Sequence, residues 1–344
     1  MSVQGSAGRG AVVGAAGEVG STAELGAVIS RWIGRVVPHD GYMLAAVDPV
    51  TGAGSFLARE NGYSVTAARR LTLGDRPEDD HSFAFERLVA GPARVAVVDA
   101  GTPGPCRTPA MRAVMADEGV GSELRVALVD AGTVWGGLVL VRAREGRPFS
   151  EADSARAQRL GPGVVAAMKR YVVGGPLEPS RLDLPPGVLV VGDDEVPMAA
   201  TPSARDWIGE LGTAPAGPDA PLESTLWDLS RATRRTGASC LTRVPTRRGW
   251  VALHAQPMTG GAPGAVAVTI APAAGAELLP AVALWHGLTP RERTITGHVL
   301  EGLATKQIAR RMELSAHTVH DHFKSIYRKT GVQAREELLA RLLG

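Results

Sequence analysis

Cysteine is nearly absent from this chain, which has only Cys106 and Cys240 among its 344 residues. Two isolated cysteines do not make a disulfide framework, and they lack the spacing of a thiolate metal site. We therefore expect a reducing, cytoplasmic environment. With 44% apolar residues, the chain is long enough for two or three folded domains with ordinary cores.

Long uncharged runs are also scarce. Residues 261–288 carry a single charge, Glu277, but three prolines divide this apolar stretch into a strand, a loop and a short helix. Near the N-terminus, Glu18 interrupts an apolar stretch too early for the core of a signal peptide. We therefore expect no membrane partner, and a flexible tail over residues 1–20.

The motifs that usually carry catalysis are missing as well. The sequence has no nucleophile elbow, no Gly-rich phosphate loop with a lysine and no metal-ligand cluster of usual spacing. His317 and His320 fall on one helix face with His298 as a third candidate, but zinc needs further ligands that are not spaced for it. Residues 20–60 lack the acidic pair of a phosphoacceptor receiver domain. We therefore predict no enzyme activity, no cofactor and no metal.

The positive charge gathers at the C-terminal end of the chain. The net charge is only +2, but residues 288–344 hold 10 Lys or Arg against 6 Asp or Glu. This segment is therefore +4, which leaves −2 for the rest of the chain. Such an asymmetry indicates a nucleic-acid surface in the basic segment.

The same basic segment shows the pattern of four short helices. Thr289, Pro290 and Glu292 combine an N-cap, a proline at the first helical position and a capping box. A helix should therefore begin at Thr289 and stop near Gly302. A second helix, residues 305–312, and a three-residue turn follow.

A third helix is predicted over residues 316–329, with Ser315 as its N-cap. Placed at 100° steps, its residues separate into an inner and an outer face. The inner stripe comprises Val319, Phe323, Ile326 and Thr330. The outer face comprises His317, His320, Asp321, Lys324 and Arg328. A polar stripe alone is usually solvated surface, but here it follows an apolar-faced helix and a short turn, which is the spacing of a helix-turn-helix.

These segments resemble the LuxR-type helix-turn-helix family. The resemblance rests on Leu288-Thr289-Pro290-Arg291-Glu292, Gly302-Leu303, Ile308-Ala309, Ser315, Thr318-Val319, His322, Lys329 and Gly331-Val332. It implies a tetrahelical domain whose third helix reads DNA and whose fourth helix contributes to dimerisation. It also implies base-reading or groove-facing roles for His320, Asp321 and Lys324, and places Thr318 near a phosphate.

The full predicted DNA-binding set extends over the second and third helices. It comprises Thr305, Lys306, Ser315, Thr318, His320, Asp321, Lys324, Arg328 and Lys329. Three residues depart from the family pattern, namely Ala304 and Ala334 in place of Ser or Thr, and Gln307 in place of Glu. Because Thr305 could cap the second helix one residue later, we expect shifted helix ends within the same fold.

Leucines crowd the short terminal helix at Leu338, Leu339, Leu342 and Leu343. They offer more apolar surface than a domain of this size easily buries by itself. We therefore expect them to pack partly at a two-fold contact, which makes the protein a homodimer.

Residues 21–171 are predicted to form one α+β domain. In order, the pattern predicts a helix over 21–37, a hairpin over 41–59, a short helix near 82–89, a strand over 93–98, a hairpin over 123–142 and a helix from 150 to about 171. With Trp135-Gly136-Gly137-Leu138 and Phe149-Ser150-Glu151-Ala152-Asp153, this order looks like a GAF domain. The alternative meaning of the two glycines is a bulge or close packing.

A proline-rich linker, residues 172–186, separates this domain from a second α+β domain over 187–273. The pattern of the second domain predicts strands at 188–191 and 196–200, helices at 202–211 and 223–235, and strands at 239–244, 250–256 and 265–271. This order is similar to a PAS domain, and the alternative is an unnamed small α+β domain. A linker helix over 274–287 leads to the helix-turn-helix domain, 288–344.

The sequence thus predicts a multidomain protein with GAF-like and PAS-like α+β sensor domains followed by an all-α helix-turn-helix domain. We expect a regulator of transcription that binds double-stranded DNA, with a small-molecule effector or a partner protein acting on the N-terminal domains. The alternative is a ligand-binding enzyme or signalling adaptor whose C-terminal domain docks protein. Salt dependence separates the two, because DNA binding releases counterions.

Overall fold

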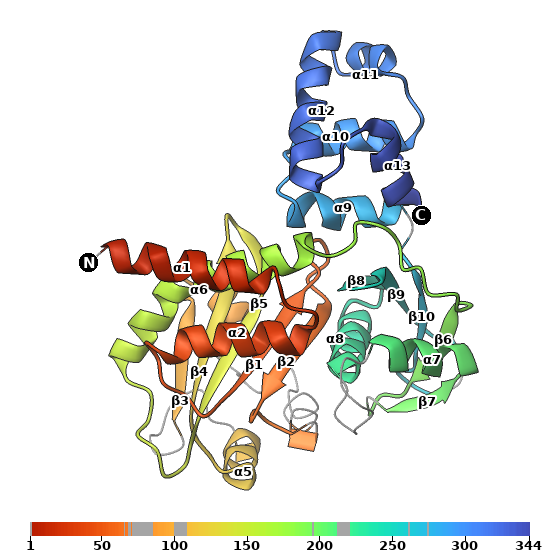
Figure 1. Cartoon of the computed structure of the whole chain (residues 1–344). Coiled ribbons are helices and arrows are strands. Elements are labelled where there is room, and N and C mark those ends of the chain that lie inside the picture. Colours follow the sequence, from red (N-terminus) through yellow and green to blue (C-terminus); the bar gives the residue numbers. More distant parts are fainter. Residues whose placement is uncertain are drawn as a thin grey trace.

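The chain folds into two α+β domains, which we call the base, and a helical domain above them (Figure 1). The computed structural model describes residues 2–64, 66–67, 70, 85–99, 109–194, 196–211, 221–260, 262–273 and 275–344. Within these residues, no helix has the length and apolarity needed to cross a membrane. The predicted fold class, α+β domains followed by an all-helical one, is confirmed.

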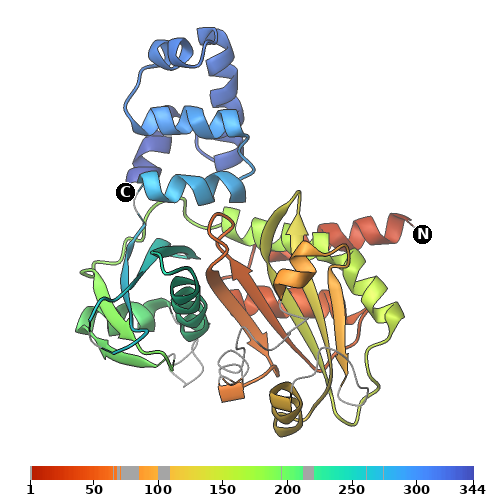
Figure 2. The ribbon, with the colours of Figure 1, turned by 180° about the vertical axis from the view of Figure 1, so that it is seen from behind.

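The first domain is built on a five-stranded antiparallel sheet of order β2-β1-β5-β4-β3. Its strands are β1 (Gly41–Val47), β2 (Gly54–Glu60), β3 (Val95–Asp99), β4 (Val120–Asp130) and β5 (Thr133–Ala143). Helices α2 (Thr22–Gly34) and α6 (Glu151–Val173) cover one face, with α1 (Ser2–Ala16) packed against both. Helices α4 (Phe85–Ala90) and α5 (Pro109–Asp117) lie on the opposite face (Figure 2).

Local backbone geometry explains the second hairpin of this sheet. Ala131 and Gly132 both adopt positive φ, of 49° and 80°, which gives the tight turn predicted between β4 and β5. Gly136 has a φ of 145°, and a Cβ there would lie 1.9 Å from the Ala45 carbonyl oxygen on β1. Only glycine lets the two strands approach this closely, so close packing is the reason for the glycine.

One prediction for the first domain is corrected by the structure, and one helix of this domain was missed. Helix α1 over Ser2–Ala16 buries Val12 and Ala16 against the rest of the domain, where the sequence predicted a flexible tail over residues 1–20. Its glycines disfavour an isolated helix, but packing through small side chains against α6 outweighs that propensity. Helix α5 was not predicted. The predicted start of a helix at residue 82 lies outside the described residues.

The second domain repeats the strand order of the first. Its antiparallel sheet has the order β7-β6-β10-β9-β8, so in both domains the second, first, fifth, fourth and third strands lie side by side. Its elements are β6 (Gly187–Val191), β7 (Pro197–Ala200), α7 (Pro202–Leu211), α8 (Pro221–Thr236), β8 (Cys240–Thr246), β9 (Gly249–Pro257) and β10 (Val266–Pro272). Helices α7 and α8 cover one face, and α8 also packs on β2 of the first domain.

The segment predicted as a linker, residues 172–186, is instead packed against the second sheet. The Ser180 backbone N–H donates to the Trp250 carbonyl at 2.9 Å, and the Trp250 indole donates to the Pro176 carbonyl at 3.1 Å. Leu177, in the same segment, is buried in a core cluster that also contains Trp250. The four prolines correctly indicated irregular backbone, but irregular backbone that pairs with a strand is held in place.

The helical domain begins with α9 (Gly275–Trp285), which lies between the base and the remaining helices (Figure 1). Those helices, which we call the head, are α10 (Pro290–Leu300), α11 (Thr305–Arg311), α12 (Ala316–Thr330) and α13 (Arg335–Leu343). The predicted capping box is present at α10, where Thr289 and Glu292 exchange hydrogen bonds. Helix α10 ends before Gly302, whose φ is +80°, as the sequence predicted.

Candidate nucleic-acid interface

Helices α11 and α12 are joined by the short turn that the sequence predicted. Glu313 takes a left-handed conformation with φ of 55°, and the Leu314 N–H donates to the Ala309 carbonyl at 2.9 Å. The Ser315 hydroxyl then accepts from the Thr318 N–H at 3.0 Å and caps α12. These contacts fix the direction in which α12 leaves α11.

The inner face of α12 holds the helix in the head. The four residues of the predicted inner stripe are buried, namely Val319, Phe323, Ile326 and Thr330. Phe323 also stacks on Tyr327, with ring centroids 5.8 Å apart. The helix ends at Gly331, whose positive φ of 73° makes it a left-handed C-cap.

The outer face of α12 is exposed, and it points away from the helices that pack on the inner face. Its exposed members are His317, His320, Asp321, Lys324 and Arg328. The Lys324 ammonium lies 3.0 Å from Asp321 Oδ1, and 64% of the Lys324 side chain is accessible. This hydrogen bond, together with the positive charges of Lys324 and the two histidines, lowers the pKa of Asp321. Exposed ion pairs are weak, so both side chains are available to a partner.

Helix α11 lies at the end of the head furthest from the base (Figure 1). Ala304 occupies its N-cap position and provides no side-chain acceptor, whereas Gln307 Oε1 accepts from the Ala304 N–H at 2.7 Å. The prediction that Thr305 caps this helix is therefore wrong, because Thr305 is its first helical residue. Thr305 and Thr318 are partly exposed, and Lys306 and Ser315 are exposed.

Lys329, unlike the rest of the predicted DNA-binding set, pairs with a buried carboxylate inside the head. Its ammonium lies 2.7 Å from Glu292 Oε2, on a carboxylate that is buried and also accepts from the Thr289 N–H. Burial alone would raise the pKa of Glu292, but the hydrogen bonds from Lys329, Thr289 and Ser325 outweigh it and lower the pKa to about 2. Lys329 therefore joins α12 to α10, and we remove it from the DNA-contacting set.

A half-buried histidine directly after α9, which sequence reasoning missed, reaches the same region. His286 Nδ1 lies 3.0 Å from the Lys329 carbonyl oxygen, and a protonated Nδ1 donates this bond. Burial lowers the pKa of His286, so the ring is neutral at pH 7. The end of α12 is thus tied to the residue that follows α9 as well as to α10.

The four leucines predicted at a dimer contact are not alike in the structure. Leu338 and Leu342 are fully buried in the core shared with α9, and Leu339 is partly buried. Leu343 remains 57% exposed. Two of the four therefore serve the chain's own core, because α9 adds a fifth helix against which α13 packs. The dimer contact stays a prediction, now centred on Leu343.

The histidines considered for a metal site contact different carboxylates. His298 Nδ1 lies 3.2 Å from Glu301, and His317 is 84% exposed with Asp321 as its neighbour at 3.9 Å. Among the residues that the structure describes, no three His, Cys, Asp or Glu side chains converge to hold a metal ion. Cys240 is a free, half-buried thiol, and Cys106 lies outside these residues.

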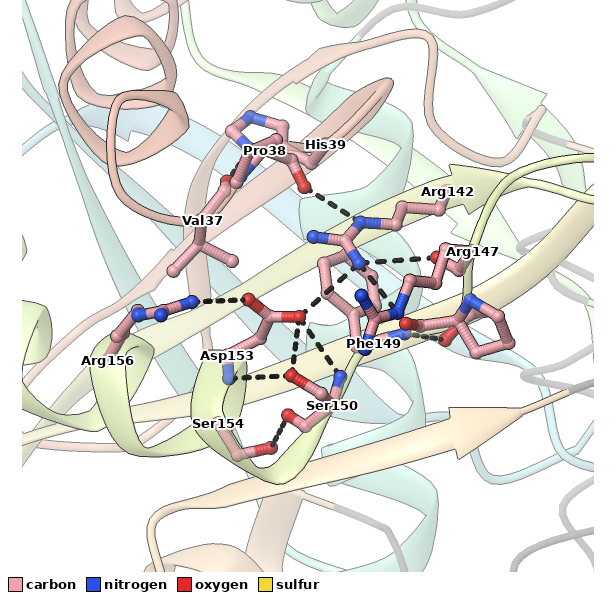
Figure 3. Close-up of polar contacts among 12 residues, drawn as sticks. Val37, Pro38, His39, Arg142, Arg147, Phe149, Ser150, Asp153, Ser154 and Arg156 are labelled. Atoms are coloured by element: carbon pink, nitrogen blue, oxygen red, sulfur yellow. Dashed lines mark hydrogen bonds and ion pairs between the residues drawn. The ribbon is translucent and has the colours of Figure 1, made fainter.

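A second polar cluster lies in the first domain around Arg142 and Asp153 (Figure 3). Arg142 donates to the carbonyl oxygens of Pro38, Arg147 and Pro148, and its guanidinium lies 4.0 Å from the centre of the Phe149 ring. Asp153 accepts from Arg142 and closes the capping box at the start of α6. The cluster ties α6 to β5 and to the loop before β1, so its role is structural.

Comparisons with known proteins concern mainly the head. Residues 286–342 match the family described as bacterial regulatory proteins, luxR family. The chain is 44% identical over 63 residues to the monoamine regulon transcriptional regulator of Klebsiella aerogenes, which covers 18% of this chain and 26% of that protein. It is 40% identical over 57 residues to the probable HTH-type transcriptional regulator GfsR of Streptomyces halstedii, covering 17% and 24%. The matched region thus spans about a quarter of each relative.

Among solved structures, the chain resembles the phycocyanobilin-bound GAF domain from a cyanobacterial phytochrome. The identity is 19%, the TM-score is 0.33, and the alignment covers 50% of this chain and 97% of that one. At this score the likeness says nothing about what this chain binds. Residues 286–342 of this chain are a LuxR-family helix-turn-helix domain.

Proposed function

We propose that this chain is a sequence-specific DNA-binding regulator of transcription, and that the outer face of α12 enters the major groove. The observation that carries the proposal is this face, which presents exposed polar side chains while the opposite face is buried in the head. The +4 charge of residues 288–344 favours a polyanionic partner. The relatives of this domain are named as transcriptional regulators, which supports a regulator rather than an enzyme.

Within this proposal, the predicted DNA-contacting residues divide into a group that contacts base edges and a group that contacts phosphates. His320, Asp321 and Lys324 lie in the second and third turns of α12 and read base edges. The hydroxyl and cationic groups around them contact phosphates and set the register of the helix in the groove. This second group comprises Thr305, Lys306, Ser315, Thr318 and Arg328.

We also propose how the protein is assembled and controlled. Two copies form a homodimer that includes Leu343, and the two α+β domains, GAF-like over 21–171 and PAS-like over 187–273, receive the signal. The input is a small-molecule effector or a partner protein, and the protein acts in the cytoplasm without a cofactor. The shared strand order of the two sheets supports a common kind of module in both domains.

The test is in vitro selection of duplexes from a random-sequence library with the full chain, followed by titration of the selected duplex at several salt concentrations. We expect the logarithm of the affinity to fall steeply with the logarithm of salt concentration. Lys324→Ala should weaken binding by about 1 to 3 kcal/mol if the contact is to a base. The matched control is Arg159→Ala, which removes an exposed cation from α6 of the first domain.

Two results would contradict the proposal. One is a selection that enriches no sequence. The other is normal binding of the selected duplex by Lys324→Ala together with salt-independent affinity, which would favour a protein-docking role for this domain.

A further inference from the structure

Helix α9 is the element through which the head rests on the base. It packs on α10 and α13 of the head, and its other side faces α6 and the second sheet (Figure 1). Gly275 lies against the Leu342 carbonyl oxygen, at a distance where a Cβ would be only 2.8 Å away. Any movement of α9 therefore moves the head with it.

The first turn of α9 is held by Arg243 of β8. Arg243 Nε donates to the Glu277 carbonyl oxygen at 2.6 Å, and Nη1 lies 2.7 Å from Asp48 Oδ2 in the β1–β2 turn. The Arg243 and Asp48 side chains are 6% and 0% exposed. His254 of β9 adds a second contact, since its Nε2 lies 2.5 Å from Glu277 Oε1. One guanidinium thus joins the first domain, the second domain and α9.

The last turn of α9 is held by the first domain. Trp285 packs edge to face on Trp135 of β5, with ring centroids 4.7 Å apart, and both indoles are buried. Lys169 of α6 covers the Trp135 ring at 4.1 Å and pairs with Asp130 at 2.7 Å. The Trp135 indole N–H has no hydrogen-bond partner among the described residues, so this ring contributes through packing.

The two domains of the base meet next to the first of these contacts. The Thr242 hydroxyl donates to the Gly54 carbonyl and the Ser55 hydroxyl donates to the Arg243 carbonyl, both at 2.7 Å and both buried. Arg243 therefore belongs to the seam between β2 and β8 as well as to the contact with α9. A shift at this seam reaches α9 without passing through any other element.

We propose that α9 is a clamp held at both ends by different domains, and that a shift between the two α+β domains reorients the head by releasing one end. The buried Asp48–Arg243 pair suits this role, because buried ion pairs can fix a relative orientation even where they add little stability. The outer face of α12 is exposed while α9 is docked. The clamp therefore sets the direction in which the head points, and it does not cover the DNA-contacting face. This consequence for DNA rests on the proposed function, whereas the clamp itself does not.

The experiment is hydrogen exchange by mass spectrometry on the full chain, which requires no DNA. The variants are Arg243→Gln, which removes the contacts to Asp48 and Glu277, and Trp135→Leu, which removes the aromatic contact to Trp285 without altering α9. The control is Arg159→Gln, at an exposed arginine of α6. We expect amides of α9 to exchange about tenfold faster or more in both variants, while those of α12 keep the wild-type rate.

A parallel titration with the duplex selected by the wild-type chain measures how the release of α9 changes the affinity for DNA. Both variants should lose several-fold in affinity, and the control should bind as the wild type does. The clamp is refuted if folded variants show wild-type exchange in α9, or if α9 and α12 accelerate together, because the domain then unfolds instead of undocking. If Arg243→Gln does not fold, Trp135→Leu decides the matter. Faster exchange in α9 with no DNA binding by the wild-type chain would refute the proposed function and leave the clamp standing.

Discussion

The head and the base place their charged side chains in opposite ways. On α12 of the head, Asp321 and Lys324 lie on the exposed face and pair with each other, and His317, which neighbours Asp321, is exposed as well. In the base, Asp48 and Glu123 are buried, and they pair with Arg243 and Arg125. Charge in the head is thus available to a partner, whereas charge in the base holds the chain together. Charged residues of the same type therefore mark a binding face in one region and a structural contact in the other.

The largest effect on stability is expected at the buried face of the helix that carries the exposed charge. Phe323→Ala removes a buried ring that stacks on Tyr327, and should lower the free energy of unfolding of the head by about 3 to 5 kcal/mol. Chemical denaturation followed by circular dichroism measures this loss. Lys324→Ala, one residue further on the exposed face, should stay within about 0.5 kcal/mol of the wild type. Equal losses for the two variants would mean that the faces of α12 are assigned wrongly.

A slightly smaller loss is expected in the base. Asp48→Ala leaves the buried Arg243 guanidinium without its carboxylate, so it should destabilise the base by about 3 kcal/mol. Thermal unfolding measured by calorimetry checks this value. The control is Asp193→Ala, at an exposed carboxylate in the second domain. If both variants unfold at the same temperature, the buried pair of the base contributes no more than a surface charge.

Glu292 is the exception in the head, because its charge is buried and structural. Its pKa is lowered from 4.5 to about 2, so its stabilising effect is fully present above pH 4.5 and is lost as the pH falls towards 2. Glu292→Gln should cost about 2 kcal/mol at neutral pH and should flatten the acid limb of the stability curve. Unfolding measured from pH 7 to pH 3 tests this. An acid limb as steep in the variant as in the wild type would contradict it.

The smallest effect on stability is expected at Leu343. Because this side chain is 57% exposed, Leu343→Ser should change the free energy of unfolding by less than about 0.5 kcal/mol while weakening self-association. Sedimentation velocity over a range of concentrations measures the association. Leu342→Asp is unsuitable for this purpose, because it places a charge in the core that α13 shares with α9. A dimer as strong in Leu343→Ser as in the wild type would exclude Leu343 from the interface.

Much of the fold was predictable because its signals are local. The caps at Thr289 and Ser315 and the positive-φ turn at Ala131-Gly132 depend on neighbouring residues. The outer face of α12 was predictable for the same reason, since a period of 3.6 residues separates inside from outside once one face is apolar. The strands of both sheets followed from alternation and turn residues.

The errors arose where a distant segment decides the outcome. Helix α1 is stabilised by packing on α6, and residues 172–186 are ordered by pairing with β9. Lys329 lay in a plausible position for DNA, but Glu292, 37 residues earlier, holds its ammonium. Leu342 looked like interface because nothing local showed that α9 would cover it.

The sequence alone therefore determined the strands, most of the helices, the caps at Thr289 and Ser315, and the exposed face of the helix that we propose to enter DNA. Only the tertiary structure decided how the three domains are joined. Asp48 and Arg243 lie 195 residues apart, and Trp135 meets Trp285 across 150 positions of the chain. Periodicity reports which side of an element is apolar, but it carries no information about which other element covers that side. The contacts that hold α9 depend on which elements pack together. Burial and charge compensation act between groups that only folding brings together.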